Sequence, residues 1–225
     1  MKIINTIEED YHIHCLQYSD WLSSIDDIIK FWWDIWLKKI AITDHSQISL
    51  DHSWIWKKTL RQLVLNRWKN VWNNMEIIFW IEWDLLNEAW DICENIQGRE
   101  GNFLMLSAHE KIYAWDPKNI NKAYENAIIR HHKKINFLWH PCMKVWWDNL
   151  DIEKLVSLAN EYEIPMEFNC SNFVNWKTDL VKLDVLLKKA NHIYVNSDAH
   201  TLSELRDNRN IWFEFLKKNY PDLFK

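Results

Sequence analysis

The stretch Tyr194-Val-Asn-Ser-Asp-Ala-His200 runs from alternating apolar residues into an aspartate and a histidine two positions apart. Side chains two residues apart on an extended strand point to the same side. Asp198 and His200 are therefore expected to aim at one point just beyond a strand end. Such a pair suits metal ligation or acid–base chemistry.

Seven short apolar runs of this kind occur along the chain, and each ends in polar side chains. The runs end near His14, His45, Glu82, His109, His140, Asn169 and His200. Between them, helical patterns are expected at residues 25–30, 57–70, 119–132, 150–162, 180–190 and 204–219. Strands that alternate with helices indicate a parallel sheet. Because the polar residues gather at strand C-termini, a closed α/β barrel is favoured over an open sheet.

Length, charge and cysteine content limit the classes of function that the chain can have. The 225 residues are expected to form one domain, spanning 1–225, with a net charge of -5 and no basic footprint for nucleic acid. The N-terminus turns acidic too early for a secretory signal, and no apolar run is long enough to span a bilayer. The four cysteines show no CxxC spacing. A reduced, cytoplasmic setting without membrane contact is the simplest interpretation, and the sequence gives no oligomeric state.

The tryptophan content is abnormal. The chain has 17 tryptophans and 2 glycines, whereas a chain of this size is expected to carry about 7% glycine, or roughly 16 residues. Several tryptophans also occupy glycine-like positions: Trp36 lies between a helix end and a strand, and Trp21 follows a Ser-Asp turn pair. Our hypothesis is that most of these tryptophans are UGA codons that the source organism reads as glycine. The alternative is a protein that is truly rich in tryptophan.

Nine side chains at or just after the strand ends are candidate metal ligands: His12, His14, Asp20, His45, Glu82, His109, His140, Asp198 and His200. A single histidine of this kind is more often structural, but six at equivalent positions weaken that interpretation. Imidazole and carboxylate without thiolate suit zinc, manganese or iron. Nine ligands exceed the need of one ion, so two or three divalent ions are expected. Their charge exceeds that of the three carboxylates, which favours an anionic substrate.

Taken together, six motifs resemble those of the PHP (polymerase and histidinol phosphatase) family. They are His12-Ile-His14, Thr43-Asp-His45, Ile81-Glu82, Ser107-Ala-His109, His140-Pro141 and Ser197-Asp-Ala-His200. The resemblance runs from about Tyr11 to His200 and implies a distorted (β/α)7 TIM-like barrel. The departures are tryptophans at positions such as Trp36, Trp80 and Trp139, where the family has glycine or a small residue.

The resemblance also implies a site with three ions. His12, His14, Glu82 and Asp198 would bind one ion, and Glu82, His109 and His140 the second. Asp20, His45 and His200 would bind the third, with Asp20 matching the family members that carry a Ser-Asp-Gly loop if Trp21 stands for glycine. Glu82, as a bridge between two ions, and Asp198, as a group that handles a proton, are the predicted catalytic residues.

The expected activity is that of a metal-dependent phosphoesterase, in which hydroxide held by the ions attacks phosphorus. A small phosphate monoester, as in histidinol phosphatases, is the preferred substrate. A nucleic-acid end, as in the 3'-5' exonuclease-type domains of family X polymerases, is the alternative within this class. A non-catalytic, metal-stabilised binding module is the alternative outside it. A related amidohydrolase is disfavoured, because no strand-end lysine is suited to bridging metals.

Other polar residues near the motifs leave two interpretations open. Asp44 is expected either to orient an imidazole or to make a strand-end hydrogen bond. Glu167 and Asn169 alternate on one strand, so both can face the barrel mouth, with a ligand-orienting role and a structural role equally expected. Lys144 and Lys177 follow strands and could meet a phosphate, although exposed lysines are common.

Overall fold

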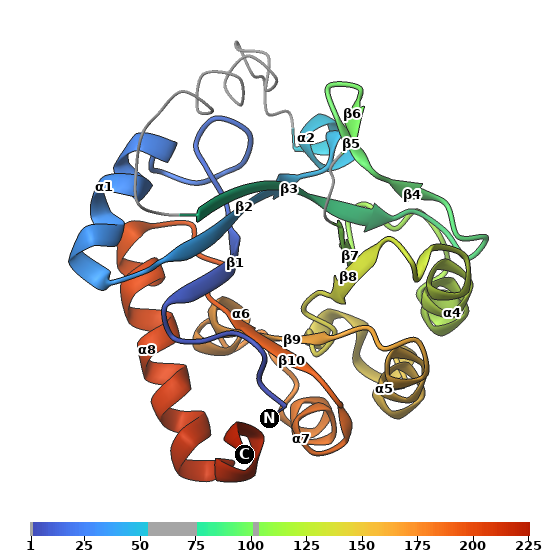
Figure 1. Ribbon diagram of the computed structural model, residues 1–225. Helices are drawn as coiled ribbons and strands as arrows, with labels where there is room; N and C mark the ends of the chain where they lie inside the picture. The colour runs from blue at the N-terminus through green and yellow to red at the C-terminus, as the bar shows by residue number, and fades with distance from the viewer. Residues whose placement is uncertain (1, 54–75, 101–103) are drawn as a thin grey trace.

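A parallel sheet curves into a nearly closed barrel with the helices outside it (Figure 1). The computed structural model describes residues 2–53, 76–100 and 104–225. Seven strands follow one another around the barrel: β1 (Glu9–Ile13), β2 (Lys39–His45), β3 (Glu76–Leu85), β7 (Leu104–Ser107), β8 (Ile135–Leu138), β9 (Met166–Asn169) and β10 (Ile193–Asn196). These are the seven predicted runs, and the predicted distorted (β/α)7 barrel is confirmed.

The seam between the first and last strands is closed by single bridges and by side chains that bond to the backbone across it, those of Asn5, Asp10 and Asn196. Ile3 pairs with Ile193, and Ile13 pairs with Ala199, both in parallel. Between these bridges, the Asn5 amide accepts a hydrogen bond from the Val195 nitrogen at 2.9 Å and donates to the Val195 oxygen at 2.8 Å. A side chain here replaces the missing backbone ladder, so the ends of β1 and β10 lie side by side and bring their histidines together.

The larger helices agree with the periodic patterns. They are α1 (Ile25–Ile35), α4 (Ile120–His131), α5 (Ile152–Glu161), α7 (Leu180–Lys189) and α8 (Leu202–Asn219). The helix expected at residues 57–70 lies outside the described residues. None of the helices in the described ranges has the length and apolarity that crossing a bilayer requires.

Several short elements were not predicted. They are α2 (Gln47–His52), α6 (Cys170–Val174), β4 (Ile92–Cys93), β5 (Asn95–Ile96), β6 (Arg99–Glu100) and the 3-10 turns Pro117–Asn119, Lys144–Asn149 and Pro221–Phe224. Each is too short to show a helical or strand period. β4 pairs antiparallel with the end of β3, and β5 pairs with β6 in a separate two-stranded sheet.

The first helix shows how local sequence sets its own ends. Ser24 caps the helix by accepting a hydrogen bond from the Asp27 nitrogen, and the Asp27 carboxylate accepts one from the Ser24 nitrogen in return. This reciprocal pair satisfies two backbone donors that a helix start leaves free. The helix ends at Trp36, whose φ of 59° is left-handed, as expected for a residue that follows a helix.

The interior of the barrel holds a small apolar cluster: Tyr11, Ala41, Trp80, Met105, Phe137 and Trp139. Larger clusters fill the space between the sheet and the helices. The buried Arg209 of α8 anchors that helix to β1, because its guanidinium donates to the carbonyl oxygens of Thr6 and Ile7 and lies 3.3 Å from the Asp10 carboxylate. The first histidine motif therefore begins on a strand that is fixed from outside the barrel.

Candidate metal centre

The strand C-termini bring the predicted ligands to one end of the barrel. The donor atoms form three groups, and the atoms within each group lie within 4.8 Å of one another. These groups are His12, His14 and Asp198; His14, His45 and His200; and His45, Glu82 and His109. Eight residues of the nine-residue set take part in these groups or touch them directly. Ligation itself stays a prediction for all nine.

The first group has the dimensions of a metal site. The Nε2 atoms of His12 and His14 lie 3.1 and 3.3 Å from the Asp198 Oδ1 atom, and 3.3 Å from each other. Ligand atoms about 2.0–2.1 Å from a tetrahedral zinc ion lie roughly 3.3–3.4 Å apart. The three donors therefore form one face of a coordination shell. Glu82, which was predicted both with this group and with His109, lies in the group of His45 and His109.

The residues predicted for the third ion also lie close together. The Asp20 Oδ1 atom lies 3.4 Å from the Nε2 atom of His45 and 3.2 Å from that of His200. Asp20 comes from the loop after β1, whereas His45 ends β2 and His200 follows β10. The ring of His14 lies against both of these imidazoles, with centroid distances of 4.4 and 4.5 Å, so the first and third groups share an edge.

Glu82 lies fully buried on β3 and links two imidazoles. Its Oε2 atom is 2.7 Å from the Nδ1 atom of His45, and its Oε1 atom is 2.7 Å from the Nε2 atom of His109. The Ser107 hydroxyl donates to the same Oε1 atom. One oxygen for each imidazole is the arrangement that a bridging carboxylate needs.

His140 is the one candidate that stands apart from the donor groups. Its ring lies 5.3 Å from the ring of His109, centroid to centroid, and it belongs to none of the three groups. The indole of the buried Trp139 lies among the imidazoles instead. Its centroid is 3.8 Å from that of His12, 4.2 Å from that of His140 and 5.6 Å from that of His109. The indole thus packs against three of the candidate imidazoles, and His140 meets His109 only by a ring contact.

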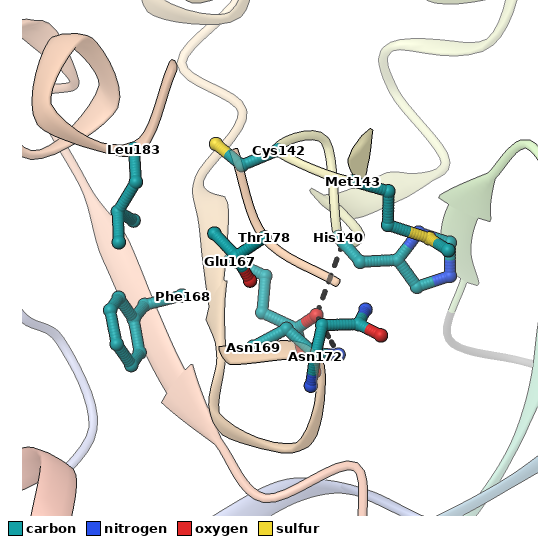
Figure 2. A pocket seen from close by; sticks show the side chains of 9 residues that line it. All are labelled: His140, Cys142, Met143, Glu167, Phe168, Asn169, Asn172, Thr178 and Leu183. Carbon is teal, nitrogen blue, oxygen red and sulfur yellow. Dashed lines mark hydrogen bonds between the residues drawn. The ribbon is translucent and has the colours of Figure 1, made fainter. Parts of the chain in front are cut away.

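Carboxylates behind the ligands hold the imidazoles in place. Glu167 accepts from the Nδ1 atom of His12 at 2.8 Å, and its other oxygen accepts from Asn169 and from the His140 backbone nitrogen. Glu167 and His140 both line a small cavity of about 10 Å³. Figure 2 shows the His140 imidazole pointing away from the Glu167 carboxylate. Of the two roles open for Glu167, the ligand-orienting one is what the contacts show.

Sequence reasoning did not single out Asp84. Its Oδ1 atom lies 2.5 Å from the Nδ1 atom of His109, and its Oδ2 atom accepts from the hydroxyls of Ser46 and Ser49. A signal existed, because Asp84 alternates with Glu82 on β3 and so faces the same side. Asp44 instead makes a strand-end hydrogen bond, accepting from the Cys15 nitrogen at 3.0 Å.

Burial and charge separate the histidines into two protonation classes. Burial lowers the pKa of His12, but the Asp198 and Glu167 carboxylates outweigh it and raise that pKa to about 10. The pKa of His45 is likewise raised to about 10 against burial, by Glu82 and Asp20. Burial lowers the pKa of His14 to about 3, and the neighbouring His45 and His200 imidazoles act in the same direction. Such shifts are typical of functional sites.

Two candidate ligands have a left-handed backbone. The φ angle is 28° at His140 and 48° at Asp198. Non-glycine residues rarely adopt this region, and such strain gathers at functional sites where the surrounding structure enforces it. Both residues lie two positions after a strand end, where the chain leaves the sheet.

The barrel resembles solved phosphatases. A histidinol phosphate phosphatase from Lactococcus lactis subsp. lactis Il1403, solved with zinc, L-histidinol and phosphate, superposes with a TM-score of 0.61 over 94% of this chain and 93% of its own, at 14% identity. A structure from Listeria monocytogenes named as a histidinol phosphatase gives 0.56 over 91% and 99%, at 8% identity. No family model and no curated protein matches the chain by sequence. At these identities the likeness establishes the fold.

Proposed function

We propose that this protein is a metal-dependent phosphoesterase that hydrolyses a small phosphate monoester. The observation that carries the proposal is the triangle of donor atoms from His12, His14 and Asp198, whose edges match those of a metal coordination shell. The second and third donor groups adjoin this triangle. A cluster of divalent ions at the C-terminal end of a barrel suits the binding of phosphate oxygens.

The donor set fits zinc, manganese or iron, since it offers nitrogen and oxygen only. Two or three such ions would activate water for attack and neutralise charge on the phosphoryl group. Glu82 and Asp198 remain carboxylates at neutral pH, because neighbouring imidazoles outweigh burial and hold the pKa of each well below its usual value. Glu82 joins two imidazoles, and Asp198 faces two others, so both are placed to position the reacting groups.

The substrate assignment is supported by the likeness to the Lactococcus lactis phosphatase, whose structure holds L-histidinol and phosphate. The fold is the feature that this chain has in common with that enzyme. A small ester also suits the net charge of -5 of this chain, since nucleic-acid backbones are usually bound through basic surfaces.

We further infer that most of the tryptophans stand where the native protein has glycine. Seven non-glycine residues of the described ranges have positive φ, and three of them, Trp36, Trp90 and Trp176, are tryptophans. A share of three in seven is far above the share of 17 in 225 that tryptophan has in the whole chain. Left-handed backbone favours glycine and disfavours any side chain with a Cβ atom.

Buried indoles support the same inference. Within the described part of the chain, the indole nitrogens of Trp21, Trp83, Trp139 and Trp212 are buried without a hydrogen-bond acceptor. A buried donor without a partner costs about 1–3 kcal/mol, so natural cores rarely contain several. Glycine at position 139 would remove the indole that packs against His12 and His140.

Mass spectrometry of peptides from the native protein tests the inference about glycine. The mass of glycine at positions 139 and 80 is the expected result, and the mass of tryptophan there would refute it. Tryptophan at position 139 would also favour the alternative of a non-catalytic binding module, because a bulky indole would then occupy the space beside His12 and His140.

Metal analysis and a substrate screen test the enzymatic proposal. The protein should contain two to three zinc, manganese or iron ions per chain and should lose phosphatase activity when a chelator removes them. The screen compares histidinol phosphate, mononucleotides and single-stranded oligonucleotides. Hydrolysis of oligonucleotides alone would favour the exonuclease alternative, and metal-loaded protein without any activity would refute the proposal.

A further inference from the structure

A cavity of about 570 Å³ opens directly beside the donor groups. His45 and His109 form part of its wall, so a molecule in this cavity would touch the candidate metal centre. Ile112, Met143 and Val145 contribute an apolar surface to the same wall. The cavity is therefore placed and shaped to hold the organic part of a substrate whose phosphate lies over the metals.

The charge of the cavity wall is opposite to that of the chain. Lys111, Lys144 and Lys177 line it together with the single acid Glu110, which leaves a formal excess of two positive charges. The whole chain has a net charge of -5. Within the described residues, none of the three lysines lies in an ion pair with a carboxylate. Seven lysines elsewhere do: Lys38, Lys39, Lys134, Lys154, Lys188, Lys189 and Lys225.

Backbone contacts fix where these lysines lie. The Lys144 nitrogen donates to the Lys177 oxygen at 2.7 Å, which ties together the loops that follow β8 and β9. The Lys144 ammonium donates to the Trp176 backbone oxygen, so it is held by a neutral partner. On the other side, Lys111 lies two residues after His109 in a turn closed by the Tyr113 nitrogen, which donates to the His109 oxygen at 2.8 Å.

Resting on the proposed phosphoesterase function, we propose that the leaving group of the substrate carries a second anionic group, a carboxylate or a phosphate, which the lysines of this cavity bind. The scissile phosphate would lie over the donor groups, the carbon body against the apolar wall, and the second anion beside Lys111 and Lys177. A cationic product such as L-histidinol would meet like charges in the same place. The substrate class therefore differs from that suggested by the product in the Lactococcus lactis structure.

Three aryl phosphates, whose para positions carry a negative charge, no charge and a positive charge, test this inference: 4-carboxyphenyl, phenyl and 4-(aminomethyl)phenyl phosphate. The full chain, with the residue that mass spectrometry finds at position 139, is loaded with zinc or manganese. The expected order of kcat/KM is carboxyphenyl over phenyl over aminomethylphenyl, with about a fivefold step for each exposed charge interaction. The steps should shrink as the salt concentration rises.

The double substitution Lys111→Gln and Lys177→Gln should reduce the preference for the carboxyphenyl ester over the phenyl ester. The matched control, Lys30→Gln with Lys218→Gln, removes the same charge from exposed positions on α1 and α8 and should keep that preference.

A kcat/KM for the aminomethylphenyl ester that equals or exceeds that for the carboxyphenyl ester would overturn the inference while leaving the phosphoesterase function intact. Faster hydrolysis of a single-stranded oligonucleotide would overturn the small-ester class. No hydrolysis of any ester would refute the proposed function and this inference with it.

Discussion

The imidazole of His12 and the indole of Trp139 lie 3.8 Å apart, centroid to centroid, with their planes inclined at 73°. Trp139 directly precedes His140 at the end of β8, so a change at this position acts on the metal centre without altering any candidate ligand. The Trp139→Gly substitution should increase the number of zinc ions bound per chain, because it removes the indole that packs against His12 and His140 and leaves room for an ion beside them. Elemental analysis after dialysis measures this number.

A second buried tryptophan provides the control. Trp146 donates from its indole to the Ala108 carbonyl oxygen and lies outside the donor groups. Trp146→Gly should cost about 3–5 kcal/mol of unfolding free energy, as large-to-small core substitutions do, and should leave zinc binding unchanged. Equal zinc content in the Trp139→Gly variant and in the chain that keeps Trp139 would contradict the role assigned to the indole.

Trp36 allows a test of glycine-like backbone that is independent of the metal. Its side chain is 79% exposed and its φ is 59°, so replacing it loses little packing and relieves left-handed strain. Trp36→Gly should raise the unfolding free energy by about 1 kcal/mol. Trp115 is also exposed but is not among the residues with positive φ, so Trp115→Gly should be neutral or destabilising. Chemical denaturation compares the two, and equal effects would argue against backbone strain at position 36.

The barrel was predictable because each long strand is an apolar run followed by a polar ligand, a pattern that needs no tertiary information. β2 and β3, which pair in register from Lys39 with Glu76 to His45 with Glu82, are of this kind. The hairpin of β5 and β6 was not predictable, since two-residue strands have no measurable period. The candidate ligands could be named from strand ends alone.

The partner of each candidate ligand depends on the direction of its side chain, and the sequence does not contain that direction. Glu82 was expected both beside His12 and His14 and beside His109, and its two oxygens contact His45 and His109. The packing of the Trp139 indole against His12 and His140 is likewise not visible in the sequence. Asp84, in contrast, could have been found from the sequence, because its alternation with Glu82 was visible there.

Asp84 should control zinc affinity without being a ligand. The Asp84→Ala substitution frees the Nδ1 atom of His109, and loss of such a partner typically weakens metal binding by about 10–100-fold. Ser46→Ala is the matched control, because it removes one hydrogen bond to Asp84 and leaves the contact with His109 in place. Competition with a zinc-binding dye measures both affinities. Equal losses would indicate a general effect on stability.

Zinc binding should release protons at pH 7. The pKa values of His12 and His45 are raised to about 10, and that of His109 lies well above its usual value, so these imidazoles are protonated in the metal-free protein. A ligating imidazole must be neutral, so each loses its proton to the solvent on binding, and apparent affinity should rise with pH up to about 10. Calorimetric titration in two buffers of different ionisation enthalpy counts the protons. Zinc binding without proton release would show that these imidazoles are neutral beforehand.

Asp198 and His200 should act on different ions although they lie two residues apart. Asp198 faces the Nε2 atoms of His12 and His14, whereas the Nε2 atom of His200 lies 3.2 Å from Asp20. Asp198→Asn should therefore lower the occupancy of the ion at His12 and His14, and His200→Gln that of the ion at Asp20 and His45. Anomalous diffraction at the zinc edge gives the occupancy of each position separately. If both variants lost the same ion, the pair would belong to one site, and its proposed place between two sites would be wrong.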